Sequence, residues 1–214
     1  MKTKDRILLT SLTLFNDEGE PNVTTVDIAT EMDISPGNLY YHFKGKEAII
    51  ERLYLIMEQE LNEVLQAPIK NDIDAENAWF YLYVVFEQIH KYQFFYRNIA
   101  DILSRYPKIN QRFSRLLKKK RATAFATLTL LEENGVAEFG DANKHSLSDS
   151  MTMLLTYWMN YTELDNRKEN NTVLAIHRGV FQLMSLLAPY LHEDYQDFYS
   201  ECKTLFEALS EELA

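Results

Sequence analysis

The most informative stretch of the sequence is Ser35-Pro36-Gly37-Asn38-Leu39-Tyr40-Tyr41-His42-Phe43-Lys44-Gly45-Lys46. Ser35 is a favoured N-cap residue, and Pro36 then occupies the first helical position, where a missing N–H leaves no hydrogen bond unmade. Leu39 and Phe43 are four residues apart, so they share one face of a helix. The pattern predicts a short helix that is anchored through this face and exposes its other side chains.

The exposed side of this helix carries side chains that suit contact with DNA. No Asp or Glu occurs between Ser35 and Glu47, although both are common nearby, and DNA phosphates repel carboxylates. The amide of Asn38 matches the edge of an adenine base, whereas Pro36 and Gly37 can only contact a thymine methyl or permit close approach. The side chains that can donate hydrogen bonds to phosphates are Tyr40, Tyr41, His42, Lys44 and Lys46. The stretch therefore predicts a recognition helix.

Together with the segment before it, this stretch resembles the DNA-binding signature of the TetR family of bacterial repressors. The resemblance is carried by Thr24-Thr25-Val26-Asp27-Ile28-Ala29 and by the run from Ile34 to Ile49. It implies a helix-turn-helix in which Thr25 lies near the backbone phosphates. The family usually has a Gly in the turn between the two helices, where this sequence has Asp33. Asp tolerates the left-handed backbone of such a turn better than most residues, so we expect the turn to be kept.

Composition independently favours an all-α protein. The 214 residues are 46% apolar, and only six Gly and five Pro interrupt long runs of good helix formers. The single Cys202 cannot form an internal disulfide, and the N-terminus lacks the pattern of a signal peptide, so we expect a cytoplasmic protein. The most apolar windows are interrupted by polar residues, so no membrane span is expected.

The net charge of −10 is unusual for a DNA-binding protein. Through Arg52 the sequence has six basic and nine acidic residues, so even this part is acidic. The basic residues are nevertheless clustered, with Lys2, Lys4 and Arg6 at the start of the first helix and Lys44 and Lys46 after the recognition helix. We therefore expect only modest non-specific affinity for DNA.

Two domains are expected: a three-helix DNA-binding domain with a helix-turn-helix over residues 1–48, and a larger helical domain for ligand binding and dimerisation over residues 49–214. Apolar periodicity predicts the first helix at residues 3–17, and Thr24 or Thr25 caps the second. A long helix follows Gly45 and runs to Pro68. Further helices are expected at about residues 74–91, 94–104, 107–134, 146–164, 172–190 and 194–213, with a loop at 138–143.

The second domain is larger than a spacer needs to be, so we interpret it as a sensor of a small molecule. Its many aromatic residues suit a mostly apolar pocket for a hydrophobic or aromatic effector. The candidates that combine apolar bulk with, in most cases, a polar group are Trp79, Tyr83, Phe86, His90, Tyr96 and Tyr157. For each of these residues taken singly, ordinary core packing is the simpler interpretation.

Other motifs carry less information. The pair Glu87 and His90 has the spacing of bundle-type di-iron sites, but such sites need a second copy, and none is found. No nucleophile motif or glycine-rich phosphate loop occurs, so we expect no enzyme, no cofactor and no metal. The run Lys118-Lys119-Lys120-Arg121 suits either an anionic partner or, more simply, a solvated helix face.

Two hypotheses for the function follow. The first, which the resemblance implies, is a ligand-responsive homodimeric repressor that binds a near-palindromic operator in double-stranded DNA. Its dimer would form through the helices from Ser146 to Leu164 and from Thr172 to Tyr190, which carry more apolar surface than one core face needs. The second is a helical carrier or enzyme of hydrophobic small molecules with a DNA-binding head that no longer functions.

Overall fold

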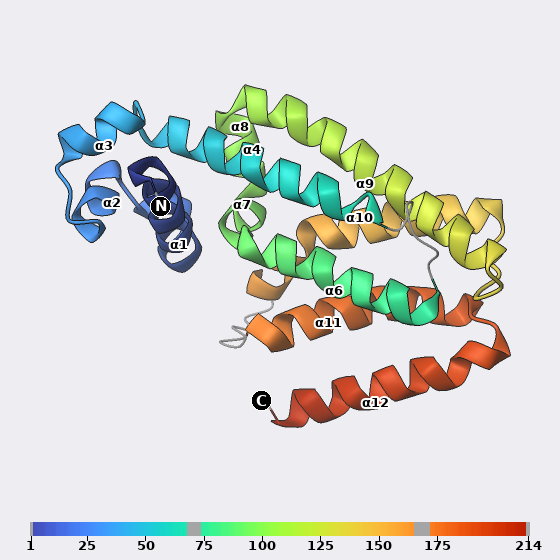
Figure 1. The fold of residues 1–214 in the computed structure, drawn as a ribbon. Helices are drawn as coiled ribbons and strands as arrows, with labels where there is room; N and C mark the ends of the chain where they lie inside the picture. Colours follow the sequence, from blue (N-terminus) through green and yellow to red (C-terminus); the bar gives the residue numbers. More distant parts are fainter. Residues whose placement is uncertain (1, 68–73, 165–171, 213–214) are drawn as a thin grey trace. The chain divides into compact units, whose positions relative to one another are not determined.

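The computed structural model describes residues 2–67, 74–164 and 172–212 (Figure 1). These residues form helices, with one isolated antiparallel bridge between Ala137 and Leu191, so the expected all-α class is confirmed. By packing, the chain divides into two units, Met1–Glu60 with Tyr92–Phe113 and Leu61–Lys91 with Ser114–Ala214. This division reflects packing, and the functional boundary expected after residue 48 stays a prediction.

The first unit contains the expected helix-turn-helix. Its N-terminal elements are α1 (Thr3–Glu18), the 3-10 turn η1 (Glu20–Asn22), α2 (Thr25–Glu31) and α3 (Pro36–His42). Thr24 caps α2: its hydroxyl accepts a hydrogen bond from the backbone N–H of Asp27, and the Asp27 carboxylate accepts one from the backbone N–H of Thr24 at 2.7 Å. This reciprocal capping box selects Thr24 over Thr25 as the cap.

The turn and the start of α3 follow the sequence pattern. Asp33 has a φ of 53°, so it takes the left-handed conformation expected of it in the turn. The Ser35 hydroxyl accepts a hydrogen bond from the backbone N–H of Asn38 at 3.2 Å, and Pro36 is the first residue of the helix. Leu39 and Phe43 are buried, as their spacing predicts. The recognition helix is thus held by one cap and two apolar anchors.

The rest of the first unit surrounds a cluster of aromatic rings. It comprises the start of α4 (Lys46–Val64), α7 (Gln93–Arg97), α8 (Ile99–Arg105) and the start of α9 (Pro107–Glu133). Phe94 packs on Phe15 of α1, and Phe95 packs on Tyr54 of α4. The single helix expected at 94–104 is wrong, because the chain leaves helical geometry at Asn98. Asn is weak in helix interiors because its amide competes for backbone hydrogen bonds.

The second unit is a helical bundle. Its remaining elements are α6 (Ala75–Lys91), α10 (Asp141–Leu164), α11 (Thr172–Leu187), the 3-10 turns η2 (Ala188–Tyr190) and η3 (Glu193–Tyr195), and α12 (Gln196–Glu212). α11 packs between α6 and α12 and also contacts α10 (Figure 1). The core of this unit therefore lies along α11.

α10 begins at Asp141, so the loop expected at 138–143 is shorter than predicted. The Glu132 carboxylate explains the difference, because it accepts hydrogen bonds from the backbone N–H groups of Phe139 and Gly140, each at 2.8 Å. Glu132 also pairs with Lys144, one turn into the helix, at 2.6 Å. These contacts fix the turn and allow the helix to start earlier than its apolar pattern indicates.

Among the described residues, one segment, Thr172–Tyr190, is long and apolar enough to cross a membrane by length and composition. A single segment of this kind is weak evidence for a span, because the core helix of a soluble protein has the same properties. Here the segment consists of α11 and η2, and α11 packs on three other helices. These contacts account for the buried residues of α11, which make up 33% of the apolar window.

Close packing of α11 on α6 depends on Gly179. A Cβ added at this position would lie 2.7 Å from Cζ and 2.8 Å from Cδ1 of Phe86, whose ring is buried. We expect Gly179→Ala to lower the free energy of unfolding by about 1–3 kcal/mol, because the clash outweighs the better helix propensity of Ala. Urea denaturation measures the change, and Phe86→Leu in the same chain should restore part of the loss. Equal or higher stability of Gly179→Ala would contradict this packing.

Candidate nucleic-acid interface and effector cavity

The outer face of α3 is open to solvent. Ser35, Pro36, Gly37 and Asn38 are exposed at its start, and Tyr40 is exposed beside them. Tyr41 is 78% exposed, which is high for a large aromatic side chain. The face therefore presents an amide and two phenols that are available to a partner.

Positive charge lies close to this face. The ammonium group of Lys44 is 4.6 Å from the centre of the Tyr40 ring, and Lys44 itself is exposed. His42 is half-buried, and its ring meets the edge of Tyr41 at 5.2 Å between centroids. On α1, Lys4 is also exposed, with its ammonium 5.4 Å from the centre of the Phe43 ring. An anionic polymer would meet a locally favourable surface despite the net charge of the chain.

Thr25 is the first residue of α2 and is half-buried. Next to it, hydrogen bonds from the side chain and backbone of Thr24 lower the pKa of Asp27, so this carboxyl group is charged at neutral pH. The negative charge of Asp27 stabilises the N-terminus of α2 through its interaction with the helix dipole.

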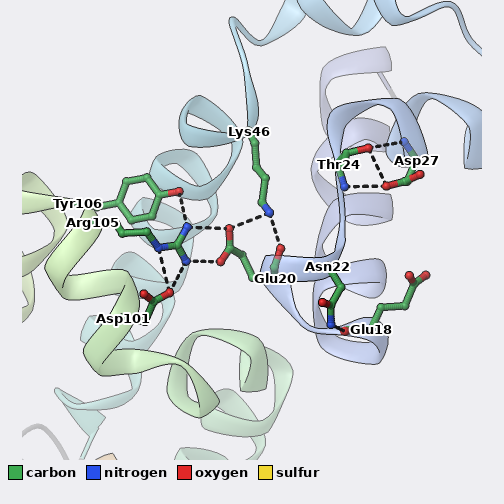
Figure 2. A network of polar contacts seen from close by, with 9 residues as sticks. All are labelled: Glu18, Glu20, Asn22, Thr24, Asp27, Lys46, Asp101, Arg105 and Tyr106. Atoms are coloured by element: carbon green, nitrogen blue, oxygen red, sulfur yellow. Dashed lines mark hydrogen bonds and ion pairs between the residues drawn. The ribbon is translucent and has the colours of Figure 1, made fainter.

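Lys46 has a different environment from the other candidates. Its ammonium lies 3.0 Å from Oε1 of Glu20 and donates a hydrogen bond to the Glu20 carbonyl (Figure 2). Arg105 of α8 pairs with the other oxygen of the same carboxylate and also with Asp101. The sequence alone did not identify Glu20 or Arg105, because Glu20 is 26 residues from Lys46 and 85 residues from Arg105 in the chain. The structure thus places Lys46 in an internal ion-pair network of the first unit.

The Glu20 carboxylate is fully buried, yet it is held in its charged form. Burial by itself raises the pKa of Glu20, but hydrogen bonds and charge from Arg105 and Lys46 together outweigh burial, and the pKa lies below its ordinary value. The network joins η1, α8 and the first residue of α4, which follows α3 closely in the chain. The network therefore helps to fix the start of α4, which lies directly after the recognition helix in the chain.

Of the six candidate ligand residues, Tyr96 belongs to the first unit and the other five belong to the second. Tyr96 is fully buried in the first unit, and Phe86 packs on Gly179 in the second. His90 lies 3.1 Å from the hydroxyl of Thr172. Trp79 and Tyr83 do meet, with 5.5 Å between ring centroids. In a separate contact, Tyr83 shares a hydrogen bond with His177, and burial lowers the pKa of this histidine.

A different set of residues lines a cavity of about 40 Å³ inside the second unit. The lining comes from Leu65, which directly follows α4, and from residues of α6, α9, α10 and α11: Ala78, Tyr81, Leu82, Val85, Lys120, Thr123, Ala124, Thr127, Leu128, Leu131, Met151, Leu155, Met184 and Leu187. None of the six candidates belongs to this described lining. The cavity is apolar apart from two threonines, one tyrosine and one lysine.

Lys120 is only 2% exposed, so its interpretation as part of a solvated helix face is wrong. Lys118 and Arg121 are exposed as expected, but Lys120 falls on the buried stripe of α9. The signal was present in the spacing, because Lys120 is four residues after Leu116 and four before Ala124, both of which are buried. Burial lowers the pKa of Lys120 to about 7.

A second, larger depression of about 820 Å³ lies on the outer surface of the second unit. It is lined by residues of α10, α11 and α12: Ser150, Met153, Leu154, Tyr157, Trp158, Tyr161, Arg178, Gln182, Leu186 and Phe206. Met153, Tyr157 and Tyr161 are exposed in the single chain. The surface is apolar enough to suit a protein partner.

Known proteins are similar to this chain along most of its length. The family model described as "Bacterial regulatory proteins, tetR family" matches residues 7–53, and the TetR model described as "Bacterial transcriptional repressor" matches residues 56–199. The crystal structure of a TetR-family transcriptional regulator from Marinobacter aquaeolei VT8 is 32% identical, covers 97% of this chain and 98% of its own, and has a TM-score of 0.85.

Two further relatives are more distant. The biofilm operon icaADBC HTH-type negative transcriptional regulator IcaR of Staphylococcus aureus (strain Newman) is 26% identical over 72% of this chain and 79% of its own. The ketosteroid transcriptional regulator KstR2 of Mycobacterium tuberculosis shares the fold at 20% identity, with a TM-score of 0.68 over 90% of this chain and 96% of its own. The chain belongs to the TetR family of bacterial transcriptional regulators.

Proposed function

We propose that this regulator is a cytoplasmic, homodimeric repressor that releases its operator when a small molecule binds in the second unit. The observation that carries the proposal is the exposed, acid-free face of α3, which is held in place by the buried side chains of Leu39 and Phe43. IcaR, to which the chain is similar, is named a negative regulator, and this supports repression over activation.

The DNA contacts in this proposal come from α3 and the residues around it. Asn38 would read a base edge, with Pro36 and Gly37 allowing close approach. The proposed phosphate contacts are Thr25, Ser35, Tyr40, Tyr41, His42 and Lys44. We assign Lys46 a positioning role instead, because its ammonium already pairs with the buried Glu20.

A homodimer would set the spacing of the two recognition helices. On B-DNA, two helices of this kind read half-sites about 34 to 36 Å apart, so a two-fold protein binds a near-palindromic site. The apolar surface over α10, α11 and α12 supports this arrangement, since a second copy would cover Met153, Tyr157 and Tyr161. Tyr157 then serves dimerisation rather than the effector role expected from the sequence.

The dimer interface can be tested by adding charge to it. We expect the double variant Met153→Glu, Tyr157→Glu to sediment as a monomer at micromolar concentration, because four carboxylates would be buried in each dimer. Phe80→Glu is the matched control, since Phe80 is exposed on α6 and does not line the depression. Loss of the dimer should also weaken operator binding, because the two half-sites would then be bound independently. A wild-type chain that is monomeric at this concentration would contradict the proposal.

In this proposal the effector releases the DNA because it binds two states of the regulator with different affinities. A ligand shifts the regulator away from DNA only if it binds more tightly to a state whose recognition helices fit the operator poorly. The cavity among α6, α9, α10 and α11 supports such coupling, because filling it would displace helices that line it. KstR2, which shares this fold, is named for ketosteroids, and this agrees with a small-molecule effector.

A further inference from the structure

Arg105 contacts the DNA-binding part of the chain from outside it. The family model of the DNA-binding region matches residues 7–53, whereas Arg105 is the last residue of α8. By packing, α8 nevertheless belongs to the first unit, together with α1, α2 and α3. The contacts of Arg105 within this unit can therefore link α8 to the recognition helix.

The guanidinium group of Arg105 contacts both oxygens of the Glu20 carboxylate (Figure 2). Its Nη2 pairs with Oε2, and its Nη1 donates a hydrogen bond to Oε1 at 3.4 Å. Two contacts from one planar guanidinium fix the orientation of a carboxylate as well as pairing its charge. Because the Glu20 side chain is fully buried, this orientation is set by protein groups.

Lys46 is held by the same carboxylate. Its ammonium lies 3.0 Å from Oε1 of Glu20, donates a hydrogen bond to the Glu20 carbonyl and lies 5.7 Å from the centre of the Phe15 ring. Lys46 is the first residue of α4, and only residues 43–45 lie between it and the end of α3. The position of Lys46 therefore restricts where α3 can lie.

The main consequence of this network is positional. A buried ion pair adds little stability relative to apolar packing, because the cost of desolvating the charges offsets their attraction. Loss of one partner is nevertheless unfavourable, since it leaves a buried charge without compensation. Each charged group is thus confined to the few positions that keep its partner in contact.

We propose that Arg105 is a positioning residue for DNA binding, which acts on the recognition helix through Glu20 and Lys46 and does not itself touch DNA. The inference rests on the proposed function, because it requires an operator that α3 reads. Reading base edges requires side chains held within about 0.5 Å of the productive geometry. Binding to any duplex depends mainly on charge near the phosphates. Arg105 should therefore affect binding to the operator and leave binding to random DNA unchanged.

The test uses fluorescence anisotropy with the full-length protein and two labelled duplexes at one salt concentration. One duplex is the inverted repeat recovered by selection of genomic fragments, and the other is a random sequence of equal length. We expect Arg105→Gln to bind the inverted repeat at least tenfold more weakly than the wild type does, and the random duplex within about twofold. Unchanged binding to the inverted repeat would overturn the inference. An equal loss on both duplexes would also overturn it, because Arg105 would then contact phosphates directly.

A double variant tests whether Arg105 acts through Glu20. Glu20→Gln alone should weaken binding to the inverted repeat about as much as Arg105→Gln does. Adding Arg105→Gln to Glu20→Gln should then change the affinity by no more than about twofold, because the link is already broken. Losses that multiply in the double variant would overturn the inference.

Asp101→Asn is the matched control for the ion pairs of Arg105. Asp101 also pairs with Arg105, but its side chain is 56% exposed, and its removal leaves the contact with Glu20 in place. The affinity for the inverted repeat should stay within about twofold of the wild type. A tenfold loss in this variant would overturn the assignment of the effect to Glu20.

Ile102→Val controls for stability. It removes one buried methyl group from α8 and keeps the ion pairs, so it should lower the stability but not the affinity for the inverted repeat. All variants are measured at a temperature at which circular dichroism shows them to be folded. A loss of affinity in Ile102→Val that equals the loss in Arg105→Gln would reduce the effect to general destabilisation and overturn the inference.

The outcome is distinguishable from that for the proposed function. A wild-type protein that selects no inverted repeat would refute the proposed repressor, and the inference with it. A wild-type protein that binds the repeat no more tightly than Arg105→Gln does would refute the inference alone.

Discussion

Glu20→Gln lowers the free energy of unfolding by about 2–3 kcal/mol. The change leaves two cations facing a neutral amide, and removing one partner of a buried ion pair typically costs about 3–5 kcal/mol. The lower figure applies because Lys46 and Arg105 are 22% and 39% exposed and so keep some contact with water. Urea denaturation followed by circular dichroism measures the change in the midpoint at constant slope.

Glu18→Gln provides the control for this prediction, since Glu18 is exposed and lies only two residues away. We expect it to change stability by no more than about 0.5 kcal/mol. A Glu20→Gln protein as stable as Glu18→Gln would show that the buried network contributes nothing to the fold.

The same network predicts a dependence on pH with a defined sign. The pKa of Glu20 lies below its ordinary value of 4.5, so its ion pairs contribute fully above that value. As the pH falls through the lower pKa of the folded state, protonation removes the contribution. The difference in stability between the wild type and Glu20→Gln should therefore shrink below pH 4.5.

Tyr41→Ala weakens binding to the operator by at least about a hundredfold. A hydrogen bond from the phenol to a charged phosphate is worth about 1.5–3 kcal/mol, and a homodimer loses two of them. Stability should change little, because Tyr41 is 78% exposed and contributes almost nothing to the core. Fluorescence anisotropy with a labelled operator duplex measures the affinity at a fixed salt concentration, which must be stated because binding to phosphates depends on it.

Leu9→Ala is the matched control, because Leu9 is another exposed apolar side chain of the first unit and lies on α1. We expect its affinity for the operator to stay within about twofold of the wild type. Equal effects of the two substitutions would mean that α3 has no special role in DNA binding.

The helix-turn-helix could be predicted from the sequence because its determinants are local. The cap by Ser35, the proline after it, the left-handed Asp33 and the anchors Leu39 and Phe43 all lie within eleven residues, 33 to 43. Each follows from rules about neighbouring positions. The structure bears out each of these expectations.

The ion pairs and the cavity could not be predicted in the same way. Glu20 finds Arg105 across 85 residues, and no local pattern indicates which helix supplies the partner of a buried acid. Aromatic residues such as Phe86 and Tyr96 are equally consistent with a core or a pocket until the packing of the helices is known. Lys120 is an exception, because its spacing within the apolar stripe of α9 indicated in the sequence that it would be buried.

Recognition of a specific operator by α3 is tested most directly by selection of genomic fragments with the purified protein. Fragments that bind are recovered and sequenced, and the selection is repeated with Tyr41→Ala and after refolding the wild type to remove any retained ligand. We predict enrichment of one short inverted repeat by the wild type and its loss in the variant. Enrichment of no repeat by the refolded wild type, or equal enrichment by Tyr41→Ala, would contradict the account.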